Sequence, residues 1–180
     1  RLLLQRRGRP RDPFYGHLDA PAGGHVAAGE TPAQAAVREL AEEAGAVIQP
    51  ADLVLLGVLR LVDPAGACAR VHQHLFLCPR RFGPAALRPG DEVEALVETG
   101  LSDLEDLLEG RVDRIELTPV ATRTSAPLRR AEASALAAYS EPIRDTLRRS
   151  LVAIRQHFGA GCVDPGLWRP GEPDPAEPST

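Results

Sequence analysis

A helix with clear signals at both ends, preceded by a long loop, most constrains how this chain can fold. Thr31 can cap the helix, and Pro32 suits its first turn, where a backbone donor would be unpaired in any case. Apolar residues then recur at helical spacing as far as Ala44, and Gly45 is typical of a helix end. The preceding residues 12–29 are rich in Gly and Pro, which predicts mostly loop. The chain therefore presents an amphipathic helix at the end of a long loop.

Apolar segments on both sides of this helix are predicted to be β-strands. They cover residues 2–5, 53–62, 71–78 and 93–98, with a turn at residues 63–66. Ser102 can cap a further helix that runs to about Glu109. Residues from about 131 to 158 are predicted to be helical, with Pro142 either starting a second segment or kinking the first. Strands mixed with helices in this way indicate an α/β domain of packed layers.

The length of 180 residues suits one domain with a sizeable core and is short for two. We expect this domain to cover residues 1–160, with the C-terminal helices at its end. Residues 161–180 are rich in Pro and have little to bury, which predicts a mobile tail with Trp168 as its candidate anchor. The chain begins inside an apolar run, so we expect further residues before Arg1.

Charge and cysteine content argue against several classes of protein. A net charge of -4 is unlike proteins that bind nucleic acid through bulk positive charge, although a local basic pocket could still hold a small anion. The 3 cysteines form no Cys-x-x-Cys pair, which indicates neither a disulfide framework nor a zinc ribbon. No apolar run approaches the roughly 18 residues of a membrane-spanning helix, and no signal peptide is visible. We therefore expect a reduced, cytoplasmic protein without membrane association.

The first predicted helix carries a cluster of acidic residues. Glu39, Glu42 and Glu43 project from one side of it, and the apolar stripe occupies the other. Carboxylates this close repel one another unless positive charge lies among them. A hard divalent cation with oxygen ligands, such as Mg²⁺ or Mn²⁺, fits that need. A solvated acidic helix face is the alternative, because such clusters are common on protein surfaces.

The sequence around the cluster, GHVAAGETPAQAAVRELAEEAGA from Gly24 to Ala46, decides between these interpretations. It resembles the Nudix signature: Gly, five residues, Glu, seven residues, Arg-Glu, a bulky apolar residue, one residue, Glu-Glu, one residue, Gly and an apolar residue. The matching residues are Gly24, Glu30, Arg38, Glu39, Leu40, Glu42, Glu43, Gly45 and Ala46. Only Ala46 is smaller than usual. The flanks, residues 3–7 and 19–25, resemble a Nudix subgroup that is itself similar to isopentenyl diphosphate isomerase, and the likeness covers roughly residues 2–110.

The resemblance implies a Nudix-type α/β/α sandwich with a mixed β-sheet, in which a loop–helix–loop holds Mg²⁺ or Mn²⁺. The carboxylate ligands would be Glu39, Glu42 and Glu43, and the carbonyl oxygen of Gly23 or of the next residue could be added. In this class of enzyme the ion neutralises diphosphate oxygens, lowers the pKa of a bound water and screens charge on the leaving group.

The resemblance also implies roles for the other signature residues. Glu39 or Glu42 could double as the base that deprotonates the attacking water. Arg38 would orient a glutamate rather than touch substrate, and Glu30 would brace the loop against the helix. Among these residues, Arg38, Glu39 and Glu42 are therefore the catalytic candidates.

Many family members add an acidic residue from a later loop, and residues 91–94 offer one here. Glu92 is the first candidate for the base and Glu94 the second. The alternative is a polar turn before a strand, which the residues alone leave open.

Three residues are candidates for binding substrate. His25 lies in the signature loop, where it could approach a diphosphate. Arg6 and Arg7 point to opposite sides if the first strand continues through them, so one could bind phosphate while the other is solvated. The residues alone do not decide which arginine has which part.

Two further pairs are open to a functional interpretation. His72 and His74 share one face of a predicted strand and could meet a metal or a phosphate, but a half-exposed strand face is the simpler expectation. Phe14 and Tyr15 could stack on a base, but anchoring the loop is the simpler expectation.

The resulting hypothesis is an enzyme that hydrolyses a diphosphate linkage in a nucleoside diphosphate derivative or a related small molecule. One alternative, isopentenyl diphosphate isomerase, needs a cysteine just before the loop histidine, but Ala22, Gly23 and Gly24 precede His25. Another is a non-catalytic Nudix module that senses a ligand or binds a protein. Such modules often lose signature glutamates, and all of them are kept here. The C-terminal helices could form a homodimer interface.

Overall fold

The computed structural model describes residues 1–61, 71–125, 127–132, 134–137 and 141–168. Its largest sheet has the strand order β2-β1-β5-β7, and each neighbouring pair is antiparallel. The strands are β1 Leu2–Arg7, β2 Leu18–Asp19, β5 Val93–Thr99 and β7 Thr118–Thr122. A β-bulge between Arg6 and Arg7 interrupts the β1–β5 register. Bulges redirect side chains, so this one affects how the start of β5 faces its surroundings.

Helix α1, Pro32–Ala44, packs against this sheet through its apolar stripe. Thr31 and Gln34 form a capping box at its start, and Gly45 ends it with a left-handed φ of 71°. Leu40 and Ala44 share a core with Leu96 of β5. The carboxylate side of the helix is thereby turned toward the loops that precede and follow it.

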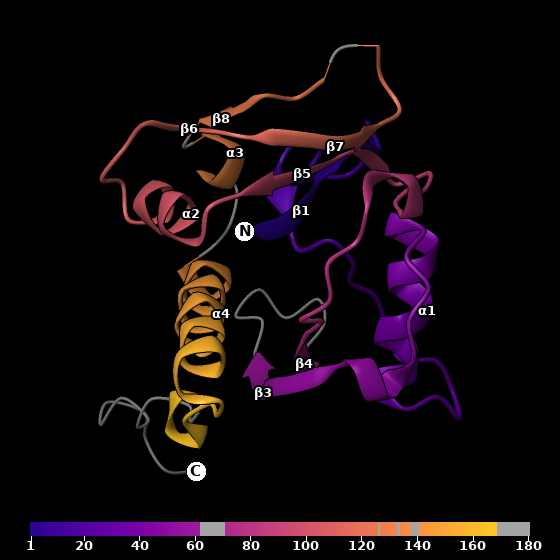
Figure 1. Cartoon of the computed structure of the whole chain (residues 1–180), viewed down its shortest axis with the longest axis vertical. Coiled ribbons are helices and arrows are strands. Elements are labelled where there is room, and N and C mark those ends of the chain that lie inside the picture. Colours follow the sequence, from indigo (N-terminus) through magenta and orange to yellow (C-terminus); the bar gives the residue numbers. More distant parts are fainter. Residues whose placement is uncertain (62–70, 126, 133, 138–140, 169–180) are drawn as a thin grey trace, which may run out of the picture.

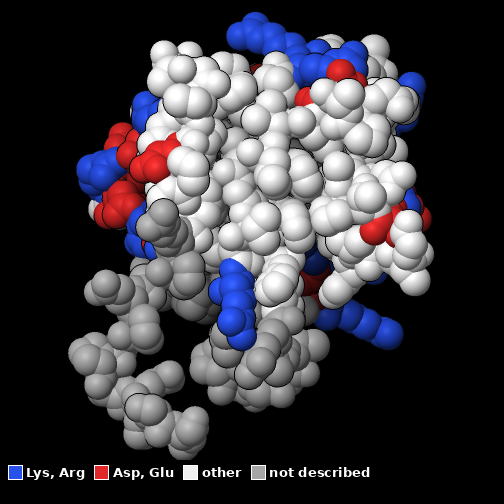
Figure 2. All heavy atoms as spheres, turned by 90° about the horizontal axis from the view of Figure 1, so that it is seen from below, with Lys and Arg blue, Asp and Glu red and all other residues white. Residues whose placement is uncertain are grey.

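A second pair of strands lies away from the main sheet, at the other end of the molecule, with α1 along one side and α4 along the other (Figure 1). The hairpin consists of β3 Val54–Leu61 and β4 Val71–Leu77, and α4 is Glu141–Ala160. Leu56 of β3, Ala153 of α4 and Trp168 form a small buried core. Figure 2 shows that, on the face seen from below, charged side chains lie mostly toward the rim and uncharged ones fill the middle.

The remaining elements cover the other face of the main sheet. They are α2 Leu101–Leu108, β6 Arg114–Glu116, β8 Arg130–Glu132 and α3 Ser134–Ala137. The short 3₁₀ turns lie elsewhere: η1 Pro50–Asp52 contacts α1, η2 Pro84–Ala86 precedes β5, and η3 Pro165–Trp168 contacts β3 and α4. Leu104, Leu107 and Leu136 pack in one core with Val97 of β5. The sheet therefore has an apolar core on each face, one under α1 and one under α2.

Most of the predicted elements are present, and the α/β class is confirmed. Where the resemblance implied a mixed sheet, the described strands form separate sheets with antiparallel pairs only. Helix α2 begins after Gly100, which takes the N-cap position expected for Ser102. The helix expected from residue 131 starts later, because residues 130–132 pair with β6 instead. The turn at residues 63–66 lies outside the described residues.

The C-terminal segment is tied to the hairpin as far as Trp168. A Cβ at Gly57 of β3 would collide with the indole ring of Trp168, so these two residues lie in close contact. Residues 169–180 lie outside the described residues, and the division of the chain at residue 160 stays a prediction. No helix in the described ranges is both long and apolar enough to cross a bilayer.

Candidate functional site

The carboxylates of α1 differ widely in their exposure to solvent. The Glu39 side chain is 15% exposed and that of Glu42 is 59% exposed, whereas Glu43 is buried. This gradient follows from the helix, because neighbouring positions turn progressively from the sheet toward water. The cluster therefore offers one solvent-facing carboxylate and two that are held inside.

Arg38 connects the helix carboxylates to the loop before the helix. Its Nε and Nη2 donate to the two carboxylate oxygens of Glu30 at 3.0 and 3.1 Å, a bidentate pairing. Its Nη1 lies 2.7 Å from Glu39 Oε1 and 3.3 Å from Glu42 Oε2, and its Nη2 donates to the His25 carbonyl at 3.1 Å. These bonds, first of all that to Glu30, raise the pKa of Arg38 above its usual range.

Glu30 closes the loop on itself as well as on the helix. Its Oε2 accepts a hydrogen bond from the Ala27 backbone at 3.0 Å, and Gly29 between them has a φ of 80°. The bond from Arg38 lowers the pKa of Glu30 and keeps it ionised. The bracing role expected for Glu30 is therefore seen in the structure.

Gly24 lies directly over the Glu39 carboxylate. A Cβ at this position would collide with Glu39 Oε1 and Cδ, so a larger residue would displace the carboxylate. The signature glycine is needed here for close approach, since the backbone passes within contact of the acid.

Glu43 is buried and has a neutral partner. Gln5 of β1 donates to Glu43 Oε2 at 2.8 Å, a contact that the sequence analysis missed although a polar residue inside an apolar strand is a signal for one. Burial raises the pKa of Glu43 to about 7. The nearby carboxylates of Glu39 and Glu92 raise this pKa further, and hydrogen bonds from Gln5 and the Gly23 backbone lower it. Burial is therefore the main reason that the pKa of Glu43 is raised.

The loop between η2 and β5 caps the end of α1. The backbone nitrogens of Arg88 and Gly90 donate to the carbonyls of Ala44 and Glu43, both at 2.8 Å. A Cβ at Gly90 would collide with the Glu42 carbonyl, so the loop lies flat on the helix end. This contact brings the residues that follow Gly90 up to the acidic helix.

The profile of the NUDIX domain family matches residues 1–120. The chain belongs to this family. A protein of Rhodococcus erythropolis named Uncharacterized Nudix hydrolase orf19 is 36% identical over 98 residues, which are 52% of this chain and 52% of that protein. The likeness thus spans about half the length of this curated relative. Membership of the Nudix family is confirmed, whereas the hydrolase activity and the isomerase-like subgroup stay predictions.

Two solved structures are also similar to this Nudix chain. A MutT/nudix family protein from Enterococcus faecalis has 23% identity and a TM-score of 0.44, covering 70% of this chain and 46% of that one. An Ap4A hydrolase from C. elegans, solved as a binary complex, has 26% identity and a TM-score of 0.39, covering 57% of this chain and 70% of that one.

The two later acidic residues of this Nudix chain are held differently. Glu92 is 43% exposed, lies 2.8 Å from Arg9 Nη2 and acts electrostatically on Glu43. Glu94 is 19% exposed and lies 3.2 Å from Arg6 Nη1. Glu92 is therefore close enough to the acidic helix to act electrostatically on Glu43.

The candidates for substrate binding are spread over different surroundings. Arg6 binds Glu94, whereas Arg7 binds Asp12 and, at 3.1 Å, Asp19. Both arginines are therefore already paired with carboxylates, and the β-bulge between them interrupts the alternation that would place them on opposite sides of β1. The side chain of His25 is exposed in the signature loop.

His72 and His74 lie on β4, exposed and half-buried respectively, in the hairpin rather than in the main sheet. Within the described residues, no group of three or more His, Cys, Asp or Glu side chains is arranged to hold a metal ion. For the acidic helix the reason is visible: Arg38 lies between Glu39 and Glu42, and Gln5 binds Glu43. These carboxylates would have to turn from their present partners toward an ion.

Proposed function

We propose that this Nudix chain hydrolyses a diphosphate linkage in a nucleoside diphosphate derivative or a related compound, with Mg²⁺ or Mn²⁺ as the cofactor. The observation that carries the proposal is the set of signature carboxylates on α1, which the chain orients through Arg38 and Gly24. A merely solvated acidic face would not need a glycine packed on Glu39 or a buried glutamate. The family supports the class of reaction, and the site supports the residues.

The donor set fits a hard divalent cation. Glu39, Glu42 and Glu43 supply carboxylate oxygens, and Gly23 can add its carbonyl, which is the chemistry that Mg²⁺ and Mn²⁺ prefer. Burial is the main cause of the raised pKa of Glu43, and a cation beside this residue would favour its charged form. When bound, the ion offsets the charge of the diphosphate and of its leaving group.

The protein's own groups account for the remaining needs of the reaction. Glu92 is assigned as the base because it is solvent-accessible, close to the acidic helix and paired only at the surface with Arg9. A carboxylate in this position can take the proton from the attacking water. Glu39 and Glu42 are the alternative bases, and Arg38 is a positioning residue for both.

Substrate oxygens are assigned to the residues nearest the signature loop. His25 can donate from its exposed imidazole, and its backbone is fixed by the bond from Arg38. Arg6 and Arg7 can bind substrate phosphate if each releases a carboxylate partner. The guanidinium group suits this exchange because it binds carboxylate and phosphate oxygens in a similar geometry.

The test is turnover of a mixed panel of diphosphates with Mg²⁺, with products identified by mass. The panel includes nucleoside diphosphate sugars, dinucleoside polyphosphates and isopentenyl diphosphate. Cleavage of a diphosphate linkage into two phosphorylated products is expected, and product mass in ¹⁸O-labelled water identifies the phosphorus attacked. Isomerisation without cleavage would contradict the proposal, and so would the absence of turnover of every diphosphate in the panel with both Mg²⁺ and Mn²⁺.

A further inference from the structure

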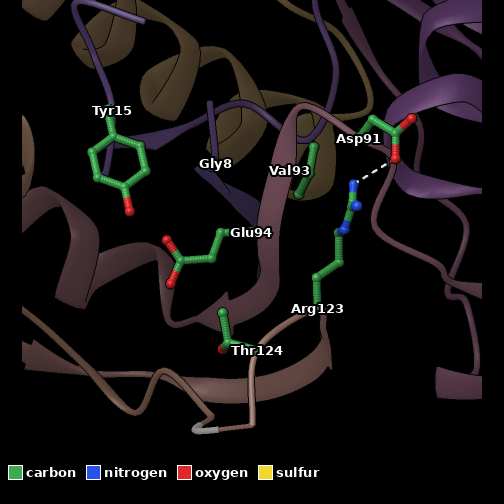
Figure 3. Close-up of a pocket in the computed structure, with 7 residues that line it drawn as sticks. All are labelled: Gly8, Tyr15, Asp91, Val93, Glu94, Arg123 and Thr124. Carbon is green, nitrogen blue, oxygen red and sulfur yellow. Dashed lines mark hydrogen bonds and ion pairs between the residues drawn. The ribbon is translucent and has the colours of Figure 1, made fainter. Parts of the chain in front are cut away.

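A cleft lies beside the acidic helix, between the β1–β2 loop, the start of β5 and the end of β7 (Figure 3). It has a volume of about 260 Å³. Pockets that hold drug-sized ligands measure about 300–1,000 Å³, so this one has room for a single ring system rather than a whole substrate. Gly8 forms part of its wall and lies close to β5, since a Cβ there would come within 2.6 Å of the Glu94 nitrogen.

Hydrogen bonds connect one end of the cleft to the acidic helix α1. Arg123 donates to the Gly90 carbonyl at 2.9 Å and to Asp91 Oδ1 at 2.7 Å, and both Arg123 and Asp91 line the cleft. Gly90 in turn donates to the Glu43 carbonyl. A diphosphate held at the acidic helix would therefore have its attached group within reach of the cleft.

The other end of the cleft holds a carboxylate with spare bonding capacity. Glu94 lies 3.2 Å from Arg6 through Oε1, while its Oε2 is buried and has no hydrogen-bond partner among the described residues. A buried carboxylate oxygen without a donor costs free energy, which a ligand donor would recover. Glu94 lines the cleft, and its soft terminal carboxylate torsion allows an oxygen to turn toward a ligand there.

The same end offers a flat apolar surface. Tyr15 is 48% exposed although it is aromatic, and Figure 3 shows its phenol end directed toward the Glu94 end of the cleft. Thr124 lines the cleft beside them. An exposed aromatic ring next to an unsatisfied acceptor suits a planar group that carries a hydrogen-bond donor.

We infer that this cleft binds the group attached to the diphosphate, and that this group is a planar nitrogen heterocycle whose amino group donates to Glu94. The inference rests on the proposed function and adds to it the chemical character of the substrate. Tyr15 stacks on the ring, and Glu94 selects the amino group. Glu94 is therefore a specificity residue, distinct from the base assigned to Glu92.

The test compares substrates that differ only in the amino group. The pairs are nucleoside diphosphate sugars with cytosine against uracil and with adenine against hypoxanthine, where an oxo group replaces the amino group. For the wild type we expect kcat/KM to favour the amino member of at least one pair by on the order of 10-fold, since a site built for a donor rejects an acceptor. Glu94→Gln puts an amide N–H where Oε2 lies, so this preference should fall to about 1-fold or reverse.

Two further variants separate selection of the amino group from general effects of substitution. Glu98→Gln makes the same change on the same strand, at a residue that binds Arg1 outside the cleft, and should keep the wild-type ratio. Tyr15→Leu, at an exposed position that tolerates substitution, should raise KM for both members of a pair and leave their ratio unchanged. Because the readout is a ratio, a general loss of rate in any variant cancels.

Calorimetric titration with the matching nucleoside monophosphates in EDTA tests the inference without turnover. Tighter binding of the amino member by the wild type, lost in Glu94→Gln, supports it even if no diphosphate in the panel is cleaved. Ratios that are identical in wild type and Glu94→Gln would overturn it. Turnover confined to diphosphates that lack a heterocycle, such as isopentenyl diphosphate, would also overturn it while leaving the proposed function intact.

Discussion

Helices α1 and α4 are fixed by different kinds of contact. Helix α1 is connected to its own loops by charged side chains, above all by Arg38, which reaches Glu30 and His25. Helix α4 packs in an apolar core, with Ala153 buried against Leu56 and Trp168. Its charged contacts, Arg148 with Glu109 and Arg155 with Glu105, reach the α2 segment and not the signature loop. The contacts of α1 come largely from nearby in the sequence, whereas Leu56 is nearly a hundred positions from Ala153.

The charged contacts around α1 orient the candidate site, whereas the core beside α4 mainly stabilises the fold. Exposed and half-exposed ion pairs contribute about 0–1 kcal/mol each to stability, but they orient the groups that they join. Buried aromatic and aliphatic side chains contribute about 2–5 kcal/mol each to the free energy of unfolding, but they do not bind or orient reacting groups directly. Changes around α1 should therefore reduce turnover more than stability, and changes around α4 should do the opposite.

Among the changes around α1, removal of the metal should reduce turnover most. EDTA should abolish turnover, and Mg²⁺ or Mn²⁺ should restore it, because the carboxylates alone cannot offset the charge of a diphosphate. Metal should also raise the melting temperature, since a ligand bound only by the folded state stabilises that state, by about 2.7 kcal/mol at 100 times its Kd. An EDTA-treated enzyme that works at the untreated rate would show that the acidic helix is not a metal site.

Glu43→Gln should lower kcat about 10³-fold or more, because the metal supplies several kcal/mol of transition-state stabilisation and Glu43 is a proposed ligand. The fold should persist, since an amide oxygen can still accept from Gln5. The checks are kcat at saturating Mg²⁺ and the melting temperature, with exposed Glu116→Gln as the control. Wild-type turnover in Glu43→Gln would remove the residue from the metal site.

Glu92→Gln should lower kcat about 100-fold with little change in metal affinity, because a general base acts in the transition state and the helix carboxylates hold the ion before it. The acidic limb of the pH–rate profile should change as well, since it reports the group that must be ionised. If Glu92→Gln is mild while Glu39→Gln or Glu42→Gln is severe, the base lies on α1 and our assignment is wrong.

Gly24→Ala should lower kcat about 10-fold, because its new Cβ collides with the Glu39 carboxylate and shifts it, and small misplacements of reacting groups are costly. Metal affinity should fall with it, while stability should change by less than about 1 kcal/mol. Gly83→Ala, where a Cβ meets no atom within 4 Å, is the matched control. Equal rates in the two variants would show that the contact with Glu39 has no role in positioning.

Trp168→Ala should leave kcat nearly unchanged at low temperature and lower the free energy of unfolding by about 3–5 kcal/mol, the usual loss for a buried aromatic residue. Chemical denaturation at constant Mg²⁺ measures this loss. Phe158→Ala, which truncates an aromatic residue that is 66% exposed on the same layer, should cost far less. A strong fall in kcat for Trp168→Ala would show that the α4 layer also positions the site.

The acidic helix and the chemistry of its side chains were predictable from the residues alone. The limits of α1, its cap at Thr31 and its end at Gly45 follow from local rules that act within a few residues. The shared face of the glutamates follows from helical periodicity, and the family follows from the spacing of the signature. The strands β1, β3, β4 and β5 were also predictable, because alternation and apolar runs are local.

The distant residues that contact these groups could not be predicted without the fold. Gln5 against Glu43, Arg9 against Glu92 and Arg6 against Glu94 depend on how β1 is placed beside α1 and β5. The strand at residues 130–132 exists because β6 provides its partners, although its sequence is compatible with a helix. The cleft joins segments from three parts of the chain. Pairing and packing between such segments depend on the summed contacts of the whole fold, which no local pattern contains.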